Sequence, residues 1–243
     1  MDKPIKQEKP IIVMKRYEMK YLLSADQTAY IKQALVGHMV LDKYGLTSIA
    51  SLYYDTPDYR LIRASIEKPP FKEKIRLRSY GLATDSSPVF LELKRKADKI
   101  VYKRRVSTTI PAVNAFFAGE GEICADGQIA REISYFRDYY GTLVPACLII
   151  YDRNAYFEPD GDLRLTIDHN PRYRVEDLNL TTSMDGISLL ESGHTVLEIK
   201  VQEAMPMWLS RVLADGQIYK GSFSKYGEAY KQQAHNVMHN YMF

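Results

Sequence analysis

The sequence predicts an α+β fold that is built on a largely antiparallel sheet. Many short segments alternate polar and apolar residues with a period of two, which is typical of strands with two unlike faces. Short turns join consecutive strands, and segments with helical spacing lie between and after them. The alternation is clearest in five segments, whose polar residues are Arg16-Glu18-Lys20, Lys74-Arg76-Arg78, Glu92-Lys94-Lys96, Arg164-Thr166-Asp168 and Glu198-Lys200-Gln202.

In the first half of the chain, residues 1–10 are expected to form a mobile leader and residues 11–23 a strand. Ser24 is a good helix cap, so a helix is expected from there to about Val36. The later elements expected in this half are a strand at 48–56, a helix at 58–66 with Thr56 as its cap and Pro57 at its first position, and strands at 72–80, 89–96 and 100–109.

In the second half, residues 111–141 have helical spacing broken by glycines, which predicts a helical insertion between strands. The Pro159-Asp160-Gly161 turn predicts a hairpin between strands at 147–157 and 163–174. After a polar loop with room for one short strand, the expected elements are a strand at 195–202, a helix at 205–216 and a last helix at 226–239.

The composition excludes several classes of protein. A net charge of +3 over 243 residues is too small to indicate bulk nucleic-acid binding. Cys124 and Cys147 lack metal spacing and are expected to be reduced thiols in a cytoplasmic protein. The sequence has no apolar leader and no apolar run near the about 20 residues of a membrane span. Because it also lacks a phosphate-binding loop, any nucleotide must be held by side chains.

The spacing Glu-x-Lys recurs on three strands, at Glu18, Glu92 and Glu198. If these polar faces point inward, the sheet must close into a barrel with helices on its apolar exterior. A site that is rich in cations and holds a few carboxylates suits a polyanion and a divalent metal. Salt bridges between neighbouring strands would explain the same pattern.

One strand offers a candidate phosphate site at Lys72, Lys74, Arg76 and Arg78, because guanidinium groups fork onto phosphate oxygens. A solvated outer strand would look the same. Lys103 and Arg105 share a face of their strand. Arg153 leaves two interpretations open, as an ion pair or as a ligand contact, whereas Asp55 is interpreted as part of a helix start.

Nine motifs occur in the order KRYEMKYLL, LYYDTPD, KIRLRSYG, VFLELKRK, YKRRV, IIYDRNAYF, LRLTID, VLEIKV and FSKY. Together they resemble the VTC domain, a polyphosphate polymerase domain of the CYTH-like, triphosphate tunnel metalloenzyme superfamily. The resemblance spans residues 11–230. It implies a closed eight-stranded antiparallel barrel, with a basic interior and helices packed outside, as a single domain over residues 11–243.

The resemblance also implies transfer of the γ-phosphoryl group of ATP to inorganic polyphosphate, with Mn²⁺ or Mg²⁺ bound. Catalytic roles would fall to Lys20, Arg76, Arg78, Lys94, Arg153, Arg164 and Lys200. Other phosphate contacts would come from Lys74, Lys103, Arg105, Lys220, Ser224 and Lys225. Glu198 would be the main metal ligand, with Glu18 and Glu92 nearby.

One position departs from the family pattern. Polymerases of this family tend to carry a lysine three residues before the lysine of FSKY, where this chain has Ser222. The nearest lysine is Lys220. The departure leaves two alternatives to the polymerase open, a triphosphatase acting in the same tunnel and a binding module without turnover. Nucleic acid is not an expected partner, and product export would need a membrane partner protein.

Overall fold

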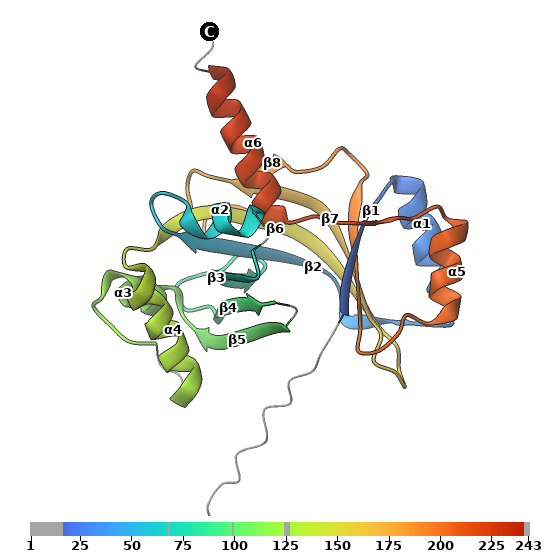
Figure 1. Cartoon of the computed structure of the whole chain (residues 1–243), viewed down its shortest axis with the longest axis horizontal. Helices are drawn as coiled ribbons and strands as arrows, with labels where there is room; N and C mark the ends of the chain where they lie inside the picture. The colour runs from blue at the N-terminus through green and yellow to red at the C-terminus, as the bar shows by residue number, and fades with distance from the viewer. Residues whose placement is uncertain (1–16, 68, 99, 124–126, 241–243) are drawn as a thin grey trace, which may run out of the picture.

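The computed structural model describes residues 17–67, 69–98, 100–123 and 127–240, with side chains described up to residue 235 (Figure 1). The strands are β1 (Tyr17–Leu23), β2 (Val40–Asp55), β3 (Phe71–Tyr80), β4 (Val89–Ala97), β5 (Ile100–Thr108), β6 (Val144–Phe157), β7 (Arg164–Arg174), β8 (Ile187–Ser188), β9 (Thr195–Val201) and β10 (Lys220–Gly221). The helices are α1 (Ala25–Ala34), α2 (Arg60–Ile66), α3 (Ile110–Ala118), α4 (Gly127–Tyr140), α5 (Met207–Asp215) and α6 (Lys225–Asn240). The expected leader and the first residues of the expected first strand lie outside the described part.

The ten described strands form one antiparallel sheet, in the order β10-β1-β9-β7-β6-β2-β3-β4-β5, with β8 added beside β7. Eight of them are 7 to 16 residues long, and β8 and β10 have two residues each. The α+β class and the antiparallel sheet are therefore confirmed. Among the described residues the pairing runs from β10 to β5 without joining these ends, so the closed barrel stays a prediction.

Several local predictions are confirmed. Ser24 caps α1 by accepting a hydrogen bond from the backbone N–H of Gln27 over 3.2 Å, while the Gln27 side chain accepts one from the Ser24 N–H over 3.1 Å. β4 pairs with β5 and β6 pairs with β7, as the two expected hairpins require. Helices α3 and α4 lie where the sequence predicts a helical insertion.

Some elements differ from the sequence prediction. β2 begins at Val40 instead of residue 48, and β10 was not expected. The helix expected from Asp58 begins at Arg60. Its start is set by Asp55, whose carboxylate accepts hydrogen bonds from the N–H groups of Leu61 and Ile62 over 2.8 and 3.0 Å. The second and third N–H groups of the helix are therefore satisfied by a residue at the end of β2, which helps to fix where the helix begins.

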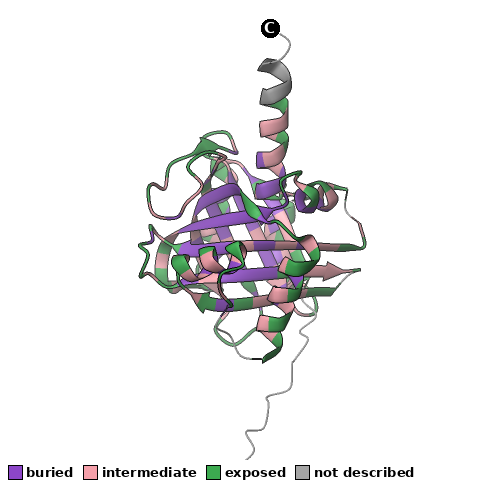
Figure 2. Cartoon of the chain, turned by 90° about the vertical axis from the view of Figure 1, so that its left-hand side faces the viewer, coloured by how far each residue is buried: buried purple, intermediate pink, exposed green. Residues whose placement is uncertain are grey.

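Four helices cover the apolar face of the sheet. The sheet residues Leu77 and Leu91 pack with Phe116 of α3 and Phe136 of α4 in one buried cluster. A second cluster joins the residues Leu165, Ile167, Leu197 and Ile199 of β7 and β9 to Ile31 and Leu35 of α1 and to Leu209 and Leu213 of α5. The buried strand surfaces are the purple bands in Figure 2. The alternation seen in the sequence thus places these apolar residues against helices.

The opposite face carries Lys20, Arg76, Glu92, Arg153 and Glu198, and is called the charged face below. Part of it is covered by α2 and α6, whose Ile62 and Tyr226 pack on Tyr53 and Ile149 in a third buried cluster. This corrects the expectation that helices pack only on the outside of the sheet. The reason is local, because β2 and β6 present aromatic and aliphatic residues on this face, and these need cover from water.

The sheet is strongly rolled about its charged face. Glu18 of β1 and Lys94 of β4 are six strand spacings apart along the sheet, about 29 Å if the sheet were flat. Their side chains nevertheless lie 3.8 Å apart. Lys74 of β3 likewise reaches Ser224, which lies between β10 and α6, over 3.4 Å. The charged faces of strands that are far apart in the sheet therefore converge on one interior.

Candidate functional site

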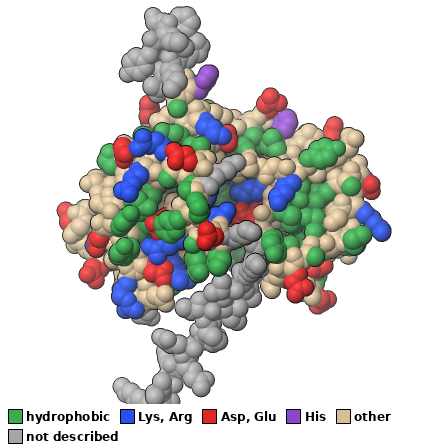
Figure 3. All heavy atoms as spheres, viewed as in Figure 1, with side chains coloured by type: hydrophobic (Ala, Val, Ile, Leu, Met, Phe, Trp, Pro, Cys, Tyr) green, Lys and Arg blue, Asp and Glu red, His purple; other side chains and the backbone are tan. Residues whose placement is uncertain are grey.

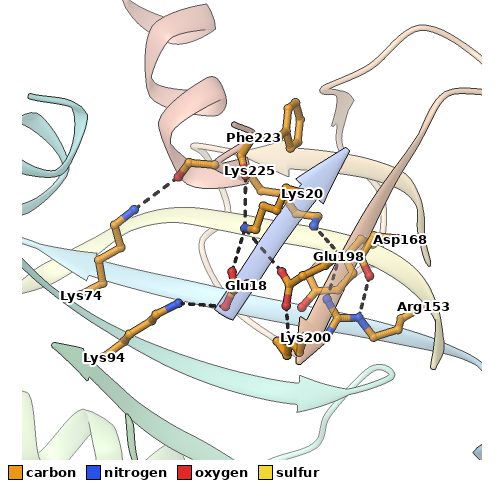
Figure 4. A network of polar contacts seen from close by, with 12 residues as sticks. Glu18, Lys20, Lys74, Lys94, Arg153, Asp168, Glu198, Lys200, Phe223 and Lys225 are labelled. Atoms are coloured by element: carbon orange, nitrogen blue, oxygen red, sulfur yellow. Dashed lines mark hydrogen bonds and ion pairs between the residues drawn. The ribbon is translucent and has the colours of Figure 1, made fainter. Parts of the chain in front are cut away.

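The first cluster in this interior is centred on Glu198 of β9 (Figure 4). Glu198 forms ion pairs with Lys200 and, over 3.5 Å, with Lys20 of β1. Lys20 also lies 3.5 Å from Glu18, which in turn faces Lys94. Burial would raise the pKa of Glu198, but Lys200 and Lys20 outweigh it and hold the pKa well below its usual range. Glu198 is therefore an ionised carboxylate in a cationic surrounding.

The second cluster is centred on Asp168 of β7, whose side chain is almost completely buried. Arg153 of β6 grips both carboxylate oxygens, with Nε···Oδ1 and Nη2···Oδ2 distances of 2.6 and 2.8 Å. Lys225, at the start of α6, also pairs with Asp168, and both cations lie over the ring of Tyr151. Burial would raise the pKa of Asp168, but Lys225 and Arg153 lower it to about 2. Asp168 therefore holds both Arg153 and Lys225 in place.

The third cluster is centred on Glu92 of β4, with cations from β3 and β5 around it. Arg76 and Arg105 donate hydrogen bonds to Glu92 over 2.9 and 2.8 Å. Lys103 lies 2.9 Å and Arg78 3.7 Å from the same carboxylate, whose side chain is 2% exposed. Burial would raise the pKa of Glu92, but Arg76, Arg78 and Lys103 together keep it well below the usual range. One buried carboxylate thus shares four cations and leaves an excess of positive charge.

Tyrosine hydroxyls fix the orientation of the arginines in this third cluster. The hydroxyl of Tyr53 accepts a hydrogen bond from Arg76 over 2.8 Å, and that of Tyr80 accepts one from Arg105 over 2.8 Å. Arg78 donates to Tyr151 over 3.3 Å. A guanidinium with two fixed partners turns its remaining N–H groups in one direction, which preorganises it for an anion.

Lys74 differs from these cations because it forms no ion pair with any described residue. Its ammonium group donates to the Ser224 hydroxyl over 3.4 Å and lies 5.8 Å from the centre of the Tyr226 ring. Burial lowers its pKa to about 7, and the neighbouring charges of Lys72 and Lys94 act in the same direction. A bound anion would stabilise the charged form of the Lys74 ammonium group.

The FSKY segment is held against the interior by contacts at its first and last residues, Phe223 and Tyr226. Tyr226 donates a hydrogen bond to the buried Asp55 carboxylate over 2.9 Å, and its ring stacks on Tyr53 with centroids 4.6 Å apart. The Phe223 carbonyl accepts a hydrogen bond from Lys20 over 3.3 Å. Ser224 and Lys225, which lie between these anchors, therefore face the strand cations.

The structure brings together most of the residues that the sequence singled out. The three clusters and Lys74 contain Lys20, Lys74, Arg76, Arg78, Lys94, Lys103, Arg105, Arg153, Lys200, Ser224, Lys225, Glu18, Glu92 and Glu198. Figure 3 shows Lys and Arg side chains recessed near the middle of this side of the molecule.

Two candidates lie apart from these contacts. Arg164 is exposed and donates to the carbonyls of Gly161 and Leu163 over 3.2 and 3.0 Å, so its side chain braces a turn. Lys220 is exposed on β10. Their roles in phosphate binding stay predictions.

The prediction did not include four residues of the interior, namely Asp168, Tyr53, Tyr151 and Tyr226. Asp168 lies in one of the five alternating segments, so its place on the charged face could have been inferred. Tyr151 shares the face of Arg153 by the same alternation. Tyr226 had no such signal, because its contacts depend on how α6 packs.

One pair of carboxylates in the interior suits a divalent metal ion such as Mg²⁺ or Mn²⁺. Such ions are commonly held by one or two carboxylates, with phosphate oxygens and water in the other positions. Glu198 and Glu18 share Lys20 and supply such a pair. Glu92 belongs to a separate cluster, and in the described part of the chain no three Asp, Glu, His or Cys side chains gather into a metal site.

The fold is that of the CYTH-like, triphosphate tunnel class of proteins. A model of the VTC domain matches residues 15–234, so the chain belongs to the VTC domain family. Among curated proteins it is 24% identical to vacuolar transporter chaperone complex subunit 4 of Schizosaccharomyces pombe, over 68% of this chain and 29% of that protein. The chain thus matches less than a third of that relative's length.

Among solved structures, one of a Bacillus halodurans protein described as a candidate adenylate cyclase is similar, with a TM-score of 0.52. Its sequence identity is 14%, over 87% of this chain and 96% of that one, so the likeness concerns the fold alone. No helix in the described part of the chain has the length and apolar character to cross a membrane.

Proposed function

We propose that the protein is a metal-dependent polyphosphate polymerase that transfers the γ-phosphoryl group of ATP to a growing polyphosphate chain. The observation that carries the proposal is the convergence of cations from β1, β3, β4, β6, β9 and α6 on one interior that also holds Glu198. Membership of the VTC domain family supports it.

We infer that this interior is a tunnel closed along its length. The contacts of Glu18 with Lys94 and of Lys74 with Ser224 support closure, because they join side chains from both halves of the rolled sheet. A tunnel suits a linear polyanion, since each phosphate along the chain would meet cations from several walls. It would also exclude much of the bulk water, which strengthens these contacts.

The cations would bind phosphate oxygens in two ways. Arg76, Arg78 and Arg153 each have a partner that fixes the guanidinium plane, so their free N–H groups would fork onto phosphates. Lys20, Lys94 and Lys200 would act as mobile point charges near Glu198. Their carboxylate partners offset part of the positive charge of the interior.

Glu198, with Glu18 beside it, would hold a Mn²⁺ or Mg²⁺ ion together with phosphate oxygens. When bound, the ion would neutralise charge on the transferring and leaving phosphate groups. Phosphoryl transfer needs no covalent nucleophile from the protein, so the residues of the chain would act by alignment of donor and acceptor and by charge stabilisation.

A second candidate function is a triphosphatase that uses the same interior, with water as the acceptor. Ser222 favours it, because the polymerase pattern has a lysine there and this exposed serine supplies no charge for an acceptor chain. A binding module that does not turn over its ligand is the third candidate. All three share the phosphate contacts and differ in the fate of the γ-phosphoryl group.

The products distinguish these candidates. Purified protein is incubated with γ-labelled ATP and Mn²⁺, and the products are resolved by gel electrophoresis. The polymerase yields a ladder of lengthening polyphosphate that is sensitive to a polyphosphatase. Free phosphate without a ladder would replace the polymerase with the triphosphatase. Ligand binding without either product would leave only the binding module.

We further propose that the reaction takes place in the cytoplasm. Export of the product would then require a membrane partner protein. The similarity to a subunit of the vacuolar transporter chaperone complex supports a search for such a partner.

A further inference from the structure

Lys74 of β3 differs from the lysines of the three clusters, because within the described part of the chain it has no carboxylate partner. Its ammonium group donates to the neutral Ser224 hydroxyl over 3.4 Å and lies 5.8 Å from the centre of the Tyr226 ring. Figure 4 shows it pointing toward the start of α6. The lysines that do form ion pairs with a carboxylate are Lys20, Lys94, Lys103, Lys200 and Lys225.

The charge balance of the interior makes this difference important. Each carboxylate of the three clusters serves at least two cations, so cations outnumber carboxylates among the described residues. Arginine stays protonated in proteins, so only a lysine can release part of the excess charge. Lys74 is the lysine that can do so without leaving a carboxylate unpaired.

The surroundings of Lys74 act in the same direction. Burial lowers its pKa to about 7, and the charges of Lys72, Lys94, Lys20 and Arg76 add to this effect. About half of the Lys74 side chains are then neutral amines at pH 7 in the free protein. A desolvated lysine beside other cations is a nucleophile at neutral pH.

The position of Lys74 also selects the kind of electrophile that can meet it. Lys94 lies directly opposite on β4, and Arg76 lies about 7 Å along the same face of β3. These cations suit a phosphate group, which would bring whatever is joined to it next to the amine. The Lys74 side chain is only half-buried, so a small molecule has access to it. An acyl phosphate combines a small size, an anionic phosphate and a carbonyl carbon that amines attack.

We propose that Lys74 is a nucleophilic lysine that accepts the acyl group of small acyl phosphates, which makes the interior a site of covalent modification. The neutral amine adds to the carbonyl carbon, a C–N bond forms, and the C–O bond to phosphate breaks. The phosphate leaves with the electron pair of that bond and takes up the proton that the nitrogen loses. The resulting amide carries no charge, so the interior loses one cation.

The inference rests on the proposed function in one respect, since the interior must hold the phosphate group of the reagent. It goes beyond that function because it gives the interior a second reaction, at carbon instead of phosphorus. Loss of the Lys74 charge would weaken polyphosphate binding. Acyl phosphates would therefore act as covalent inhibitors of the protein.

The rate of acylation at each lysine tests the inference. Purified protein is treated with acetyl phosphate at pH 7.5, and acetylation is followed over time by peptide mass spectrometry. Lys74 is expected to react at least about tenfold faster than Lys43, an exposed lysine of β2, because ordinary lysines are almost entirely protonated at this pH. An excess of tripolyphosphate should slow the reaction at Lys74 and leave that at Lys43 unchanged.

The effect on binding is measured by calorimetry with tripolyphosphate. Treatment with acetyl phosphate should weaken binding to the wild type by about fivefold to tenfold, the effect of losing one charged hydrogen bond. Lys74→Arg should lack the fast reaction, and its own affinity should be the same before and after treatment. Equal losses of affinity in the wild type and in this variant would assign the effect to other lysines and overturn the inference.

The same data separate this inference from the proposed function. Wild-type protein that binds tripolyphosphate, but reacts at Lys74 no faster than at Lys43, would overturn the inference alone. Wild-type protein that does not bind tripolyphosphate, and whose lysines all react at similar rates, would overturn both proposals.

Discussion

The hydroxyl of Tyr226 donates a hydrogen bond to the carboxylate of Asp55 over 2.9 Å, joining two residues that are 171 positions apart. Asp55 is completely buried and also accepts hydrogen bonds from the backbone N–H of Thr56 and from two N–H groups in the first turn of α2. One carboxylate therefore fixes the starts of both α2 and α6. Because Ser224 and Lys225 directly precede Tyr226, this contact sets where they meet the charged face.

Tyr226→Phe is expected to lower the free energy of unfolding by about 1–3 kcal/mol, because a buried carboxylate loses a hydrogen bond. Denaturant unfolding measures the change. Tyr219→Phe is the matched control, since the Tyr219 side chain is 78% exposed and should leave the stability unchanged. Equal stability of the two variants would show that the Asp55 contact contributes nothing.

Glu92→Gln should destabilise the protein by about 3–5 kcal/mol, because it leaves Arg76, Arg78, Lys103 and Arg105 without their shared carboxylate. Tripolyphosphate should restore part of the loss, so the rise in melting temperature on adding it should exceed that of the wild type. Glu191→Gln, at a carboxylate that is 90% exposed, is the control. A ligand-induced rise no larger than in the wild type would contradict the role of Glu92 as a countercharge.

Glu198→Gln should reduce Mn²⁺-dependent turnover by at least about a hundredfold, as expected when a metal ligand is lost. Mn²⁺ together with tripolyphosphate should stabilise the wild type more than tripolyphosphate alone, and this difference should vanish in the variant. Glu92→Gln should keep the difference, since Glu92 lies in a separate cluster. Undiminished Mn²⁺ stabilisation in Glu198→Gln would remove Glu198 from the metal site.

The lowered pKa of Lys74 predicts that polyphosphate binding depends on pH. Burial, together with Lys72, Lys94, Lys20 and Arg76, lowers its pKa to about 7, so in the free protein it loses its charge as the pH rises through 7. A bound polyphosphate favours the charged form and raises this pKa, so binding above pH 7 must take up a proton. The affinity should therefore fall as the pH rises from 7 to 9.

Calorimetry in buffers of different ionisation heat measures this proton uptake at pH 8. Lys74→Arg keeps a charge throughout the range, and should bind polyphosphate with less proton uptake and a flatter pH profile. Identical uptake in the wild type and in this variant would assign the proton to another group.

The strands and their faces could be predicted because alternation is a local property of the chain. Glu198 and Lys200 had to share a face wherever β9 lay in the sheet, and the same holds for Arg76 and Arg78 of β3. That these faces meet in one interior depends on strand order and on the rolling of the sheet. The sequence suggested it only through the repeated Glu-x-Lys spacing and the resemblance to a family.

The partners of the charged residues could not be predicted in the same way. Glu92 looked like a metal ligand in the sequence, whereas the structure surrounds it with four cations, because β3 and β5 both present basic residues beside it. The position of α6 depends on the Asp55–Tyr226 contact, and no periodicity in the sequence encodes it. Pairing across long sequence separations is fixed by packing, so it appears only in the folded structure.

The central claim, that the rolled charged face binds a chain of phosphates, is tested most directly by a crystal structure of the protein with tripolyphosphate and Mn²⁺. The phosphates are expected between Arg76, Lys94, Arg153 and Lys200, with the metal on Glu198. Phosphates bound only outside this interior, with Arg76 still on Glu92 and Arg153 still on Asp168, would contradict the claim.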